Sequence, residues 1–333
     1  MKYLSRYLIV LFLLINSTLF SQGWKKKYGS SPFYESITQI GEAPNGGYIA
    51  VSNSDTLGGS WVGEVFKIDV DGNLQWRKYL GNPVTDGYGC SFATLNNGYV
   101  FVITQVDTTF WDYPNQWSYD LFLIRTDLSG NALWTKSLYK PLGLYEEPFS
   151  IKRTTDGGYI ISGGIQDSTV FNENLYIVKT DSSGNTQWDW RFNNNFVLDY
   201  TKNVEEASDG GFAFIGFVSN FPNFFKLDQG GNSLWQKTYV YSGVWLEEFT
   251  QAYDSGFVFC GTYIQQNTQS LYVLKTDSAG DTLWSRTYPN NGFTYMPQKI
   301  KKTQDGNYII SGNGYYFNNQ YKYFLVKIDA SGN

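Results

Sequence analysis

Two short motifs recur in a fixed order along the chain, and such repetition constrains the fold more than any other feature. The first is Lys/Arg-x-Asp-x-x-Gly-x-x-x-Trp, which begins at Lys67, Arg125, Lys179, Lys226 and Lys275, with a sixth, partial copy from Lys327. The second is Asx-x-Gly-aromatic, whose aromatic residues are Tyr48, Tyr99, Tyr159, Phe212 and Phe257, with a variant copy at Tyr308. Consecutive aromatic residues of this motif are 45 to 60 residues apart, which is the period of a repeat protein.

Each repeat is predicted to fold as four short strands joined by two tight hairpins. In the third repeat the predicted strands cover residues 149–154, 159–162, 175–180 and 186–192. The turn Asp156-Gly157-Gly158 joins the first two, and Asp181–Asn185 joins the last two, because Gly accepts positive φ and Asp hydrogen-bonds to the nearby backbone. Four strands per repeat of about 50 residues predict an all-β fold, a β-propeller of six blades over residues 24–333.

The two ends of the repeat region are complementary. Trp24-Lys25-Lys26-Lys27-Tyr28-Gly29 matches the segment that carries the Trp in each repeat, whereas the sixth repeat lacks its own outer strand. Pairing of the N-terminal strand with the last repeat would close the ring and remove two free strand edges. A chain that continues beyond Asn333 with further blades or a tail is the other interpretation, and the sequence leaves both open.

Residues 1–23 have the features of a signal peptide. Lys2 and Arg6 precede the apolar run YLIVLFLLI, and cleavage after Ser21 or Gly23 fits the small residues there. The apolar run is shorter than the roughly 20 residues that span a bilayer. We therefore expect the mature chain to be secreted or displayed on the outer cell surface, with the periplasm as an alternative, and to have no membrane span.

Composition excludes several classes of function. The chain has no His and only two Cys, which excludes Ser-His-Asp triads, His-ligated metals and four-cysteine zinc sites. Its net charge of −5 is unlike that of nucleic-acid-binding proteins, which need a basic face. Any chemistry would have to rest on carboxylate, Tyr, Lys or Ser side chains.

Residues that recur in every repeat are interpreted as structural, because one functional site does not need six copies. The recurrent Asp of the second hairpin is expected to accept hydrogen bonds from backbone N–H groups in its turn. The recurrent Trp residues are expected to lie between neighbouring blades: Trp24, Trp76, Trp134, Trp188, Trp235 and Trp284.

The Asp-x-x-Gly-Asn-x-x-Trp segments resemble the tryptophan-docking repeats of quinoprotein-like (PQQ-like) β-propellers, with a turn one residue shorter. They are also similar to the Asp-box hairpins of sialidases, although the spacing of Asp, Gly and Trp differs. Over nearly all of residues 24–333 the pattern resembles secreted tandem-repeat proteins of the Bacteroidota. Such relatives commonly end in a type IX secretion sorting domain, and none is visible in this sequence.

The resemblance does not extend to a cofactor. Quinoproteins often have an adjacent Cys pair beside the quinone, whereas Cys90 and Cys260 are far apart in this sequence. Asp69-Val70-Asp71-Gly72-Asn73 partly mimics the start of an EF-hand, but Leu80 stands where the loop needs its twelfth-position Glu. We expect no cofactor and no metal.

The face that carries the irregular loops is the expected location of function. Loops on a rigid scaffold concentrate binding residues, and Tyr and Trp offer an apolar ring with a polar tip. This face carries aromatic residues outside the repeat pattern, and Phe110–Trp117 is the densest group. The candidate ligand-binding residues are Phe110, Trp111, Tyr113, Trp117, Tyr145, Trp245, Tyr295 and Tyr315.

Carboxylates are expected at the channel mouth on the same face. Two of them at a suitable separation would serve as acid and base in glycoside cleavage, and a solvated acidic rim is the other interpretation. The candidates are Glu35, Glu146, Glu147, Glu247 and Glu248.

The sequence favours an exported, non-catalytic propeller that binds a polysaccharide or a protein at the cell surface through its aromatic loop face. One alternative is a carbohydrate-active enzyme that uses the channel-mouth carboxylates. Another is a structural repeat segment of a larger cell-surface protein.

Overall fold

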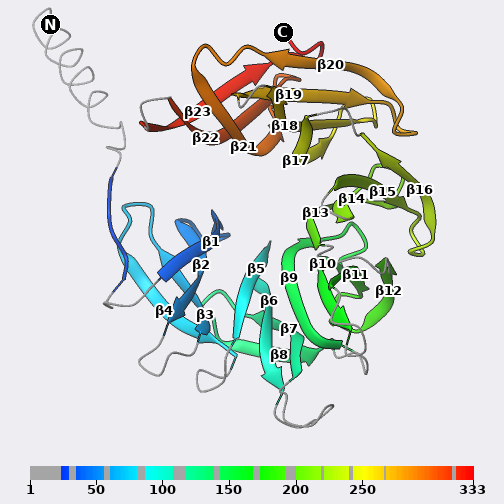
Figure 1. The fold of residues 1–333 in the computed structure, drawn as a ribbon. Coiled ribbons are helices and arrows are strands. Elements are labelled where there is room, and N and C mark those ends of the chain that lie inside the picture. Colours follow the sequence, from blue (N-terminus) through cyan, green and yellow to red (C-terminus); the bar gives the residue numbers. More distant parts are fainter. Residues whose placement is uncertain are drawn as a thin grey trace, which may run out of the picture.

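The computed structural model describes residues 24–29, 35–55, 61–81, 87–107, 118–138, 143–167, 173–192, 200–218, 221–239, 243–265, 268–316 and 320–333. These residues form 23 β-strands and no helix. Consecutive strands pair antiparallel to form blades, which follow one another in chain order around a central axis (Figure 1). The predicted all-β propeller with six blades is confirmed.

The first three blades each have four strands. Blade 1 comprises β1 (Glu35–Glu42), β2 (Tyr48–Asp55), β3 (Trp61–Ile68) and β4 (Leu74–Leu80). Blade 2 comprises β5 (Gly87–Leu95), β6 (Gly98–Asp107), β7 (Ser118–Thr126) and β8 (Ala132–Ser137). Blade 3 comprises β9 (Gly143–Arg153), β10 (Tyr159–Asp167), β11 (Glu173–Thr180) and β12 (Thr186–Phe192). A single parallel bridge between Tyr119 and Tyr145 joins the sheets of blades 2 and 3.

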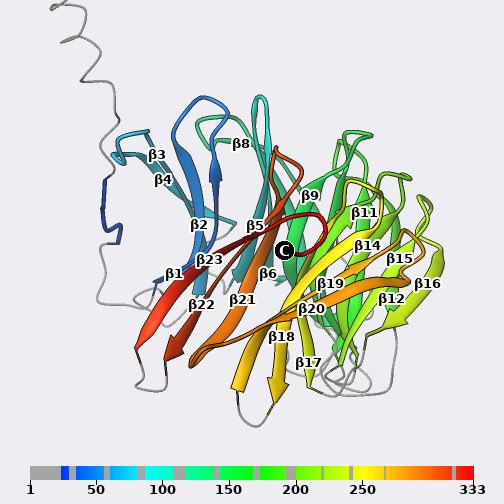
Figure 2. The same cartoon turned by 90° about the horizontal axis from the view of Figure 1, so that it is seen from above.

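The last three blades continue the arc, and Figure 2 shows the same blades from above. Blade 4 comprises β13 (Tyr200–Glu206), β14 (Phe212–Val218), β15 (Phe221–Leu227) and β16 (Ser233–Thr238). Blade 5 comprises β17 (Val244–Gln251), β18 (Phe257–Gln265), β19 (Thr268–Thr276) and β20 (Thr282–Tyr288). Blade 6 comprises three strands, β21 (Phe293–Lys302), β22 (Tyr308–Tyr316) and β23 (Tyr321–Ile328).

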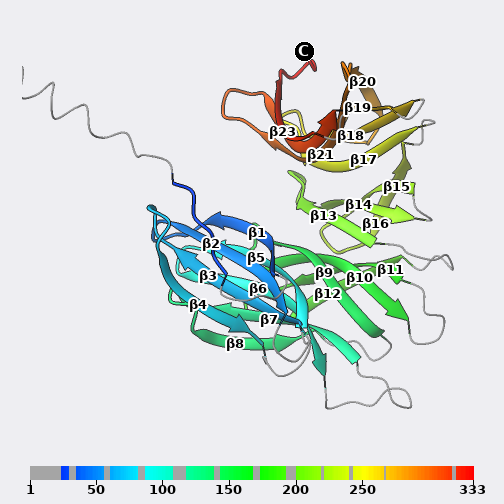
Figure 3. The same cartoon turned by 60° about the vertical axis from the view of Figure 1, so that its left-hand side comes forward.

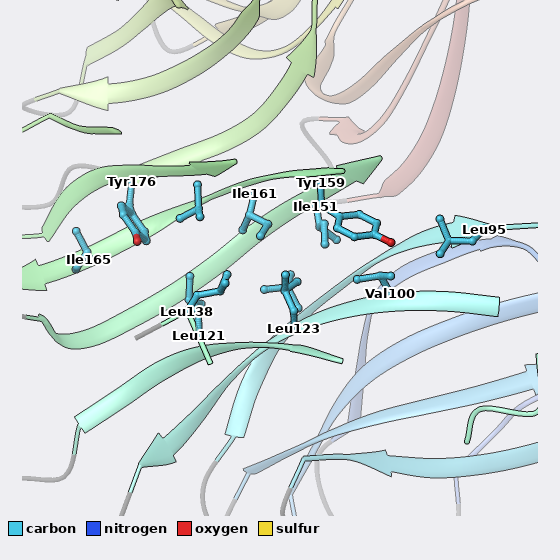
Figure 4. Packing of buried hydrophobic residues seen from close by; sticks show 12 residues of the cluster. Leu95, Val100, Leu121, Leu123, Leu138, Ile151, Tyr159, Ile161, Ile165 and Tyr176 are labelled. Atoms are coloured by element: carbon cyan, nitrogen blue, oxygen red, sulfur yellow. The ribbon is translucent and has the colours of Figure 1, made fainter. Parts of the chain in front are cut away.

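The hydrophobic core lies between blades. One cluster joins Leu121 and Leu123 of β7 to Ile151 of β9 and Ile161 of β10, and all four side chains are buried (Figure 4). Equivalent clusters join the other neighbouring blades. Each blade therefore buries its apolar side chains only when its neighbour is present.

The second hairpin of each blade is held by its Asp. In blade 3, Oδ1 of Asp181 accepts hydrogen bonds from the backbone N–H groups of Ser183 and Asn185, at 2.9 and 2.8 Å. Oδ2 of the same carboxylate accepts a bond of 2.9 Å from the side-chain amide of Asn185. The same three bonds are present in the hairpins that begin at Asp69, Asp127 and Asp329.

The recurrent Trp of each outer strand lies on the second hairpin of the next blade. Gly184 of blade 3 has φ of +79°, and a Cβ at this position would lie 2.7 Å from Cη2 of Trp134 in blade 2. Gly130, Gly231, Gly280 and Gly332 approach the Trp of the preceding blade equally closely. Only glycine allows this turn and this contact together.

A buried cation of the third strand links the two hairpins within a blade. Nζ of Lys179 bonds to Asp156 of the first hairpin at 2.7 Å and to the backbone oxygen of Thr180 at 2.9 Å. Lys226 and Lys275 bond in the same way to Asp209 and Asp254. A buried ammonium needs a partner, and in these three blades the Asp of the other motif supplies it. This pairing gives a physical reason for the two motifs to recur together.

The ring is not closed by strand pairing in this structure. Residues 24–29 form no strand, and within the described part of the chain β23 pairs only with β22. Figure 3 shows blade 1 and blade 6 as the two ends of the arc. The segment from Trp24 instead lies against the second hairpin of blade 1, where Trp24 Nε1 donates to the backbone oxygen of Val70.

We predict that Trp134→Ala lowers the free energy of unfolding by about 3–5 kcal/mol, because it removes a ring packed between two blades. Leu133→Ala is the matched control, since Leu133 is adjacent on the same strand and 59% exposed. It should change stability by only about 0.5 kcal/mol. Urea unfolding followed by circular dichroism measures both. An equal effect of the two substitutions would contradict the inter-blade role of the Trp.

The pair of Asp156 and Lys179 predicts a pH dependence of stability. Burial raises the pKa of Asp156, but hydrogen bonds from Lys179, Thr154 and the N–H of Gly158 lower it from 3.8 to about 2. A pKa below the unfolded value means that the stabilisation is complete above pH 3.8 and is lost as the pH falls towards about 2. The difference in unfolding free energy between the wild type and Asp156→Asn should therefore shrink over this window. A difference that stays constant down to about pH 2 would contradict the assignment.

Candidate functional site

A central channel runs between the innermost strands of the blades. The cavity has a volume of about 810 Å³ and is lined by residues of all six blades. Side chains alternate along a strand, so the residues on either side of a buried position in β21 face this channel. Lys299 and Lys301 of β21 line it, whereas Ile300 between them is buried in the core between blades 5 and 6.

The channel wall carries more cations than carboxylates, although the protein as a whole is acidic. The lining carboxylates are Glu147 and Glu248. The lining cations are Lys152, Arg153, Lys202, Lys299 and Lys301.

Three of these lysines are neutralised by neighbouring blades. Lys152 of blade 3 lies 3.1 Å from Glu205 of blade 4. Ion pairs also join Lys202 of blade 4 to Glu247 of blade 5, and Lys299 of blade 6 to Glu248 of blade 5. Ion pairs in the channel wall therefore join blade 3 to blade 4, blade 4 to blade 5 and blade 5 to blade 6.

The pKa of Lys152 is lowered by its surroundings in the channel. Burial lowers the pKa of its ammonium group, and the nearby cation of Lys301 lowers the pKa further. The carboxylates of Glu205 and Glu248 oppose both effects. Lys152 of blade 3 and Lys301 of blade 6 both line the channel.

The predicted carboxylates divide between channel and core. Glu147 and Glu248 line the channel, but Glu146 is only 1% exposed, and its Oε2 accepts a hydrogen bond from the backbone N–H of Leu121. Glu146 and Glu147 are adjacent in β9, and side chains alternate along a strand. Glu146 therefore points into the core between blades, and Glu147 points to the channel. Glu35, at the start of β1, is half-buried.

Glu248 is fully engaged by other side chains. Its Oε1 accepts a bond of 2.6 Å from the amide of Asn203, and its Oε2 pairs with Lys299. It is also only 4% exposed. Both carboxylate oxygens of Glu248 therefore already accept hydrogen bonds from other side chains.

A second hollow lies between blades 5 and 6, at the ends of the strands from which the variable loops emerge. It has a volume of about 500 Å³ and contains the predicted residues Trp245 and Glu247. Three side-chain amides complete one wall, those of Gln269, Gln298 and Asn313. None of these amides makes a side-chain hydrogen bond within the described part of the chain.

Trp245, which contributes to the lining of this hollow, packs against blade 4. Its ring lies 5.0 Å from that of Phe217 in blade 4, and the side chain is half-buried. Glu247 contributes one carboxylate, whose Oε2 pairs with Lys202. The lining of the hollow therefore includes an aromatic residue and amide donors and acceptors that have no hydrogen-bond partner among the described residues.

The other predicted aromatic residues are scattered. Tyr145 packs against Tyr119 at 5.5 Å, and Tyr315 packs against Tyr321 at 5.5 Å. Tyr295 lies between Phe293 and Phe324, with 4.9 Å to each ring. These three residues cover local apolar surface. Phe110, Trp111, Tyr113 and Trp117 lie outside the described residues.

The sequence analysis named Trp245 and Glu247 as candidates, but it did not name the three amides that line the same hollow. Gln and Asn in polar segments carry no pattern of their own, and only the fold brings β19, β21 and β22 to one hollow. Among the described residues, no group of three or more acidic or Cys side chains is placed to hold a metal ion. Nor does the described part of the chain contain a helix long and apolar enough to cross a membrane.

No protein-family model and no curated protein sequence matches the chain. Prolyl oligopeptidase B from Galerina marginata is similar in structure, with a TM-score of 0.52 and 11% identity over 90% of this chain and 41% of that chain. A sialidase of Trypanosoma rangeli has a TM-score of 0.49 and 11% identity over 88% of this chain and 55% of the sialidase. A Bacteroides caccae protein of unknown function has a TM-score of 0.48 and 12% identity over 81% of this chain and 87% of that one.

These neighbours show what the chain shares with known proteins. At 11% identity the likeness to the peptidase shows a propeller-type fold and nothing of activity. The chain spans about half of the sialidase, at 55%, and less of the peptidase, at 41%. The comparisons contain no sequence evidence for the PQQ-like or Bacteroidota repeat families.

Proposed function

We propose that this chain is an exported, non-catalytic binding module that recognises a glycan on its variable-loop face. The hollow between blades 5 and 6 carries the proposal, because its lining includes Trp245 and three amides that make no hydrogen bond within the described part of the chain. A sugar ring offers an apolar face for stacking and hydroxyl groups that both donate and accept. Trp, Gln and Asn provide the complementary groups.

The chemistry of the hollow supports binding over cleavage. Glu247 is the one carboxylate among its lining residues in the described part of the chain, and its Oε2 is paired with Lys202. Glycoside hydrolysis by the usual route needs two carboxylates on opposite sides of the scissile bond. A single carboxylate therefore fits a role for Glu247 in holding a hydroxyl group of the glycan.

The export and cell-surface placement in this proposal rest on the sequence. The signal-peptide features of residues 1–23 and the resemblance to secreted tandem-repeat proteins with type IX sorting domains both point outside the cytoplasm. A polysaccharide is the ligand that we favour, and a protein partner is the alternative. No cofactor is part of the proposal.

Affinity electrophoresis of residues 24–333 tests the proposal, with laminarin, xyloglucan, starch and polygalacturonate as probes and with reducing ends assayed on the same samples. We predict retardation by at least one polysaccharide and no new reducing ends. The double substitution Gln269→Ala/Gln298→Ala should weaken that binding about tenfold, since each lost hydrogen bond costs roughly 0.5–1.5 kcal/mol.

Gln304→Ala is the matched control, because Gln304 is exposed on the hairpin that joins β21 to β22, at the opposite end of these strands. It should leave retardation unchanged. New reducing ends would contradict the non-catalytic assignment and direct attention to Glu147 and Glu247. Absence of retardation by every probe would contradict glycan binding and favour a protein partner.

A further inference from the structure

A hollow at the tight hairpins of blades 2 and 3 carries two arginine side chains. It has a volume of about 430 Å³. The polar side chains that line it are Asn96, Asn97, Arg125, Arg153, Tyr159 and Ser182. Among the described residues, no Asp or Glu belongs to its lining. The arginine hollow, as we call it, is therefore a cationic site in an acidic protein.

Arg125 is a buried cation that bonds only to uncharged oxygens. Its side chain is 7% exposed. Nη2 donates to the side-chain oxygen of Asn97 at 2.5 Å, and Nη1 donates to the backbone oxygen atoms of Thr126 and Tyr99. Within the described part of the chain, Arg125 forms no ion pair. A buried charge without an opposite charge is costly, so an anion beside Arg125 would be stabilised.

Arg153 brings a second guanidinium group to the same hollow. It is exposed, and its side chain makes no hydrogen bond or ion pair with any described residue. Burial raises the pKa of Tyr159, and the positive charges of Arg125 and Arg153 oppose this effect. The N–H donors of Arg153 are therefore available to a ligand beside Arg125.

The corresponding hollow between blades 3 and 4 has the opposite balance of charge. Glu206 holds there the position that Arg153 has in the arginine hollow, at the same register beside the first hairpin. The cation of that hollow, Lys179, pairs with Asp156 at 2.7 Å. Two carboxylates thus accompany one cation between blades 3 and 4, whereas two cations line the arginine hollow with no described carboxylate. The repeat therefore does not require the two arginines.

We propose that the arginine hollow binds a tetrahedral oxyanion, a sulfate or phosphate group, either as the free ion or as an ester. Guanidinium groups pair with such oxygens through two parallel N–H bonds. Blade 2 contributes Arg125 and the amide of Asn97, and blade 3 contributes Arg153 and the hydroxyl of Ser182. A tetrahedral group directs oxygens to more sides than a planar carboxylate does, and so suits donors from two blades. The site is separate from the hollow lined by Trp245 and does not depend on glycan binding there.

Isothermal titration calorimetry of residues 24–333 at constant ionic strength tests the proposal. The probes are sodium sulfate, sodium phosphate, glucose 6-sulfate and sodium acetate. We predict saturable binding of sulfate or phosphate at one site per chain, and weaker binding of acetate. Tighter binding of glucose 6-sulfate than of inorganic sulfate would assign the site to an ester. Equal or weaker binding of the ester would assign it to the free ion.

Two variants change the charge of the hollow without a large change of shape. Arg153→Glu introduces the residue that blade 4 carries at this position, so the fold should tolerate it. Asn97→Asp is isosteric and places a carboxylate at the atom to which Arg125 donates. Each should weaken sulfate or phosphate binding about tenfold or more, because each puts a negative charge where the anion would bind. Circular dichroism checks that both variants are folded.

Lys301→Glu is the matched control, because it makes the same change of charge as Arg153→Glu. Lys301 lines the central channel together with Arg153, but it does not line the arginine hollow. Its substitution should leave the affinity unchanged. Weaker binding in Lys301→Glu with normal binding in Asn97→Asp would overturn the proposal and assign the anion to the channel. Acetate binding as tight as that of sulfate, or no saturable binding of sulfate or phosphate, would also overturn it.

Discussion

The fold depends on the contact between each outer-strand Trp and the second hairpin of the next blade. The ring of Trp134 lies so close to Gly184 that a Cβ there would be 2.7 Å from it. Three hydrogen bonds to Asp181 fix the hairpin that presents this Gly. The bonds from the side chain and backbone of Asn185 also lower the pKa of Asp181, which keeps the carboxylate ionised as an acceptor. Packing between blades therefore depends on a polar turn.

The buried cation of the third strand explains why the Lys motif and the Asx motif occur together. In blades 3, 4 and 5 a Lys pairs with the Asp of the first hairpin. Where blade 1 has Asn45 in that hairpin, Lys67 bonds instead to the backbone oxygen of Gly46. Blade 2 has Asn96 there, and Arg125 bonds to the side-chain oxygen of Asn97. The first hairpin thus carries an Asp in some blades and an Asn in others, but in each of these blades the Lys or Arg of the third strand bonds to that hairpin.

Much of the fold could be predicted from the sequence, because its determinants are local and repeated. The six repeats, both hairpins and the position of each Trp follow from motifs of about ten residues. The candidate site was less predictable, because it depends on which side of a strand a residue faces. Glu146 and Glu147 are adjacent and equally polar, yet one is buried beside Leu121 and the other lines the channel.

The hollow lined by Trp245 was also difficult to predict from the sequence. Gln269, Gln298 and Asn313 come from three strands and are separated in sequence, so only the packing of blade 5 on blade 6 brings them together. A scaffold fixed by repeated contacts leaves such loop-end positions free to vary without loss of the fold. The turns that repeat from blade to blade therefore lie on the hairpin face, whereas the side chains that differ between blades lie on the loop face.

A double-mutant cycle of Trp134→Ala and Gly184→Ala measures the central contact directly. Gly184→Ala in the wild type should be destabilising, because its Cβ meets the Trp ring and its φ is positive. In the Trp134→Ala background only the backbone strain remains, so the two effects should deviate from additivity by about 1–3 kcal/mol. Additivity within about 0.3 kcal/mol would contradict the claim that the Trp–Gly contact holds neighbouring blades together.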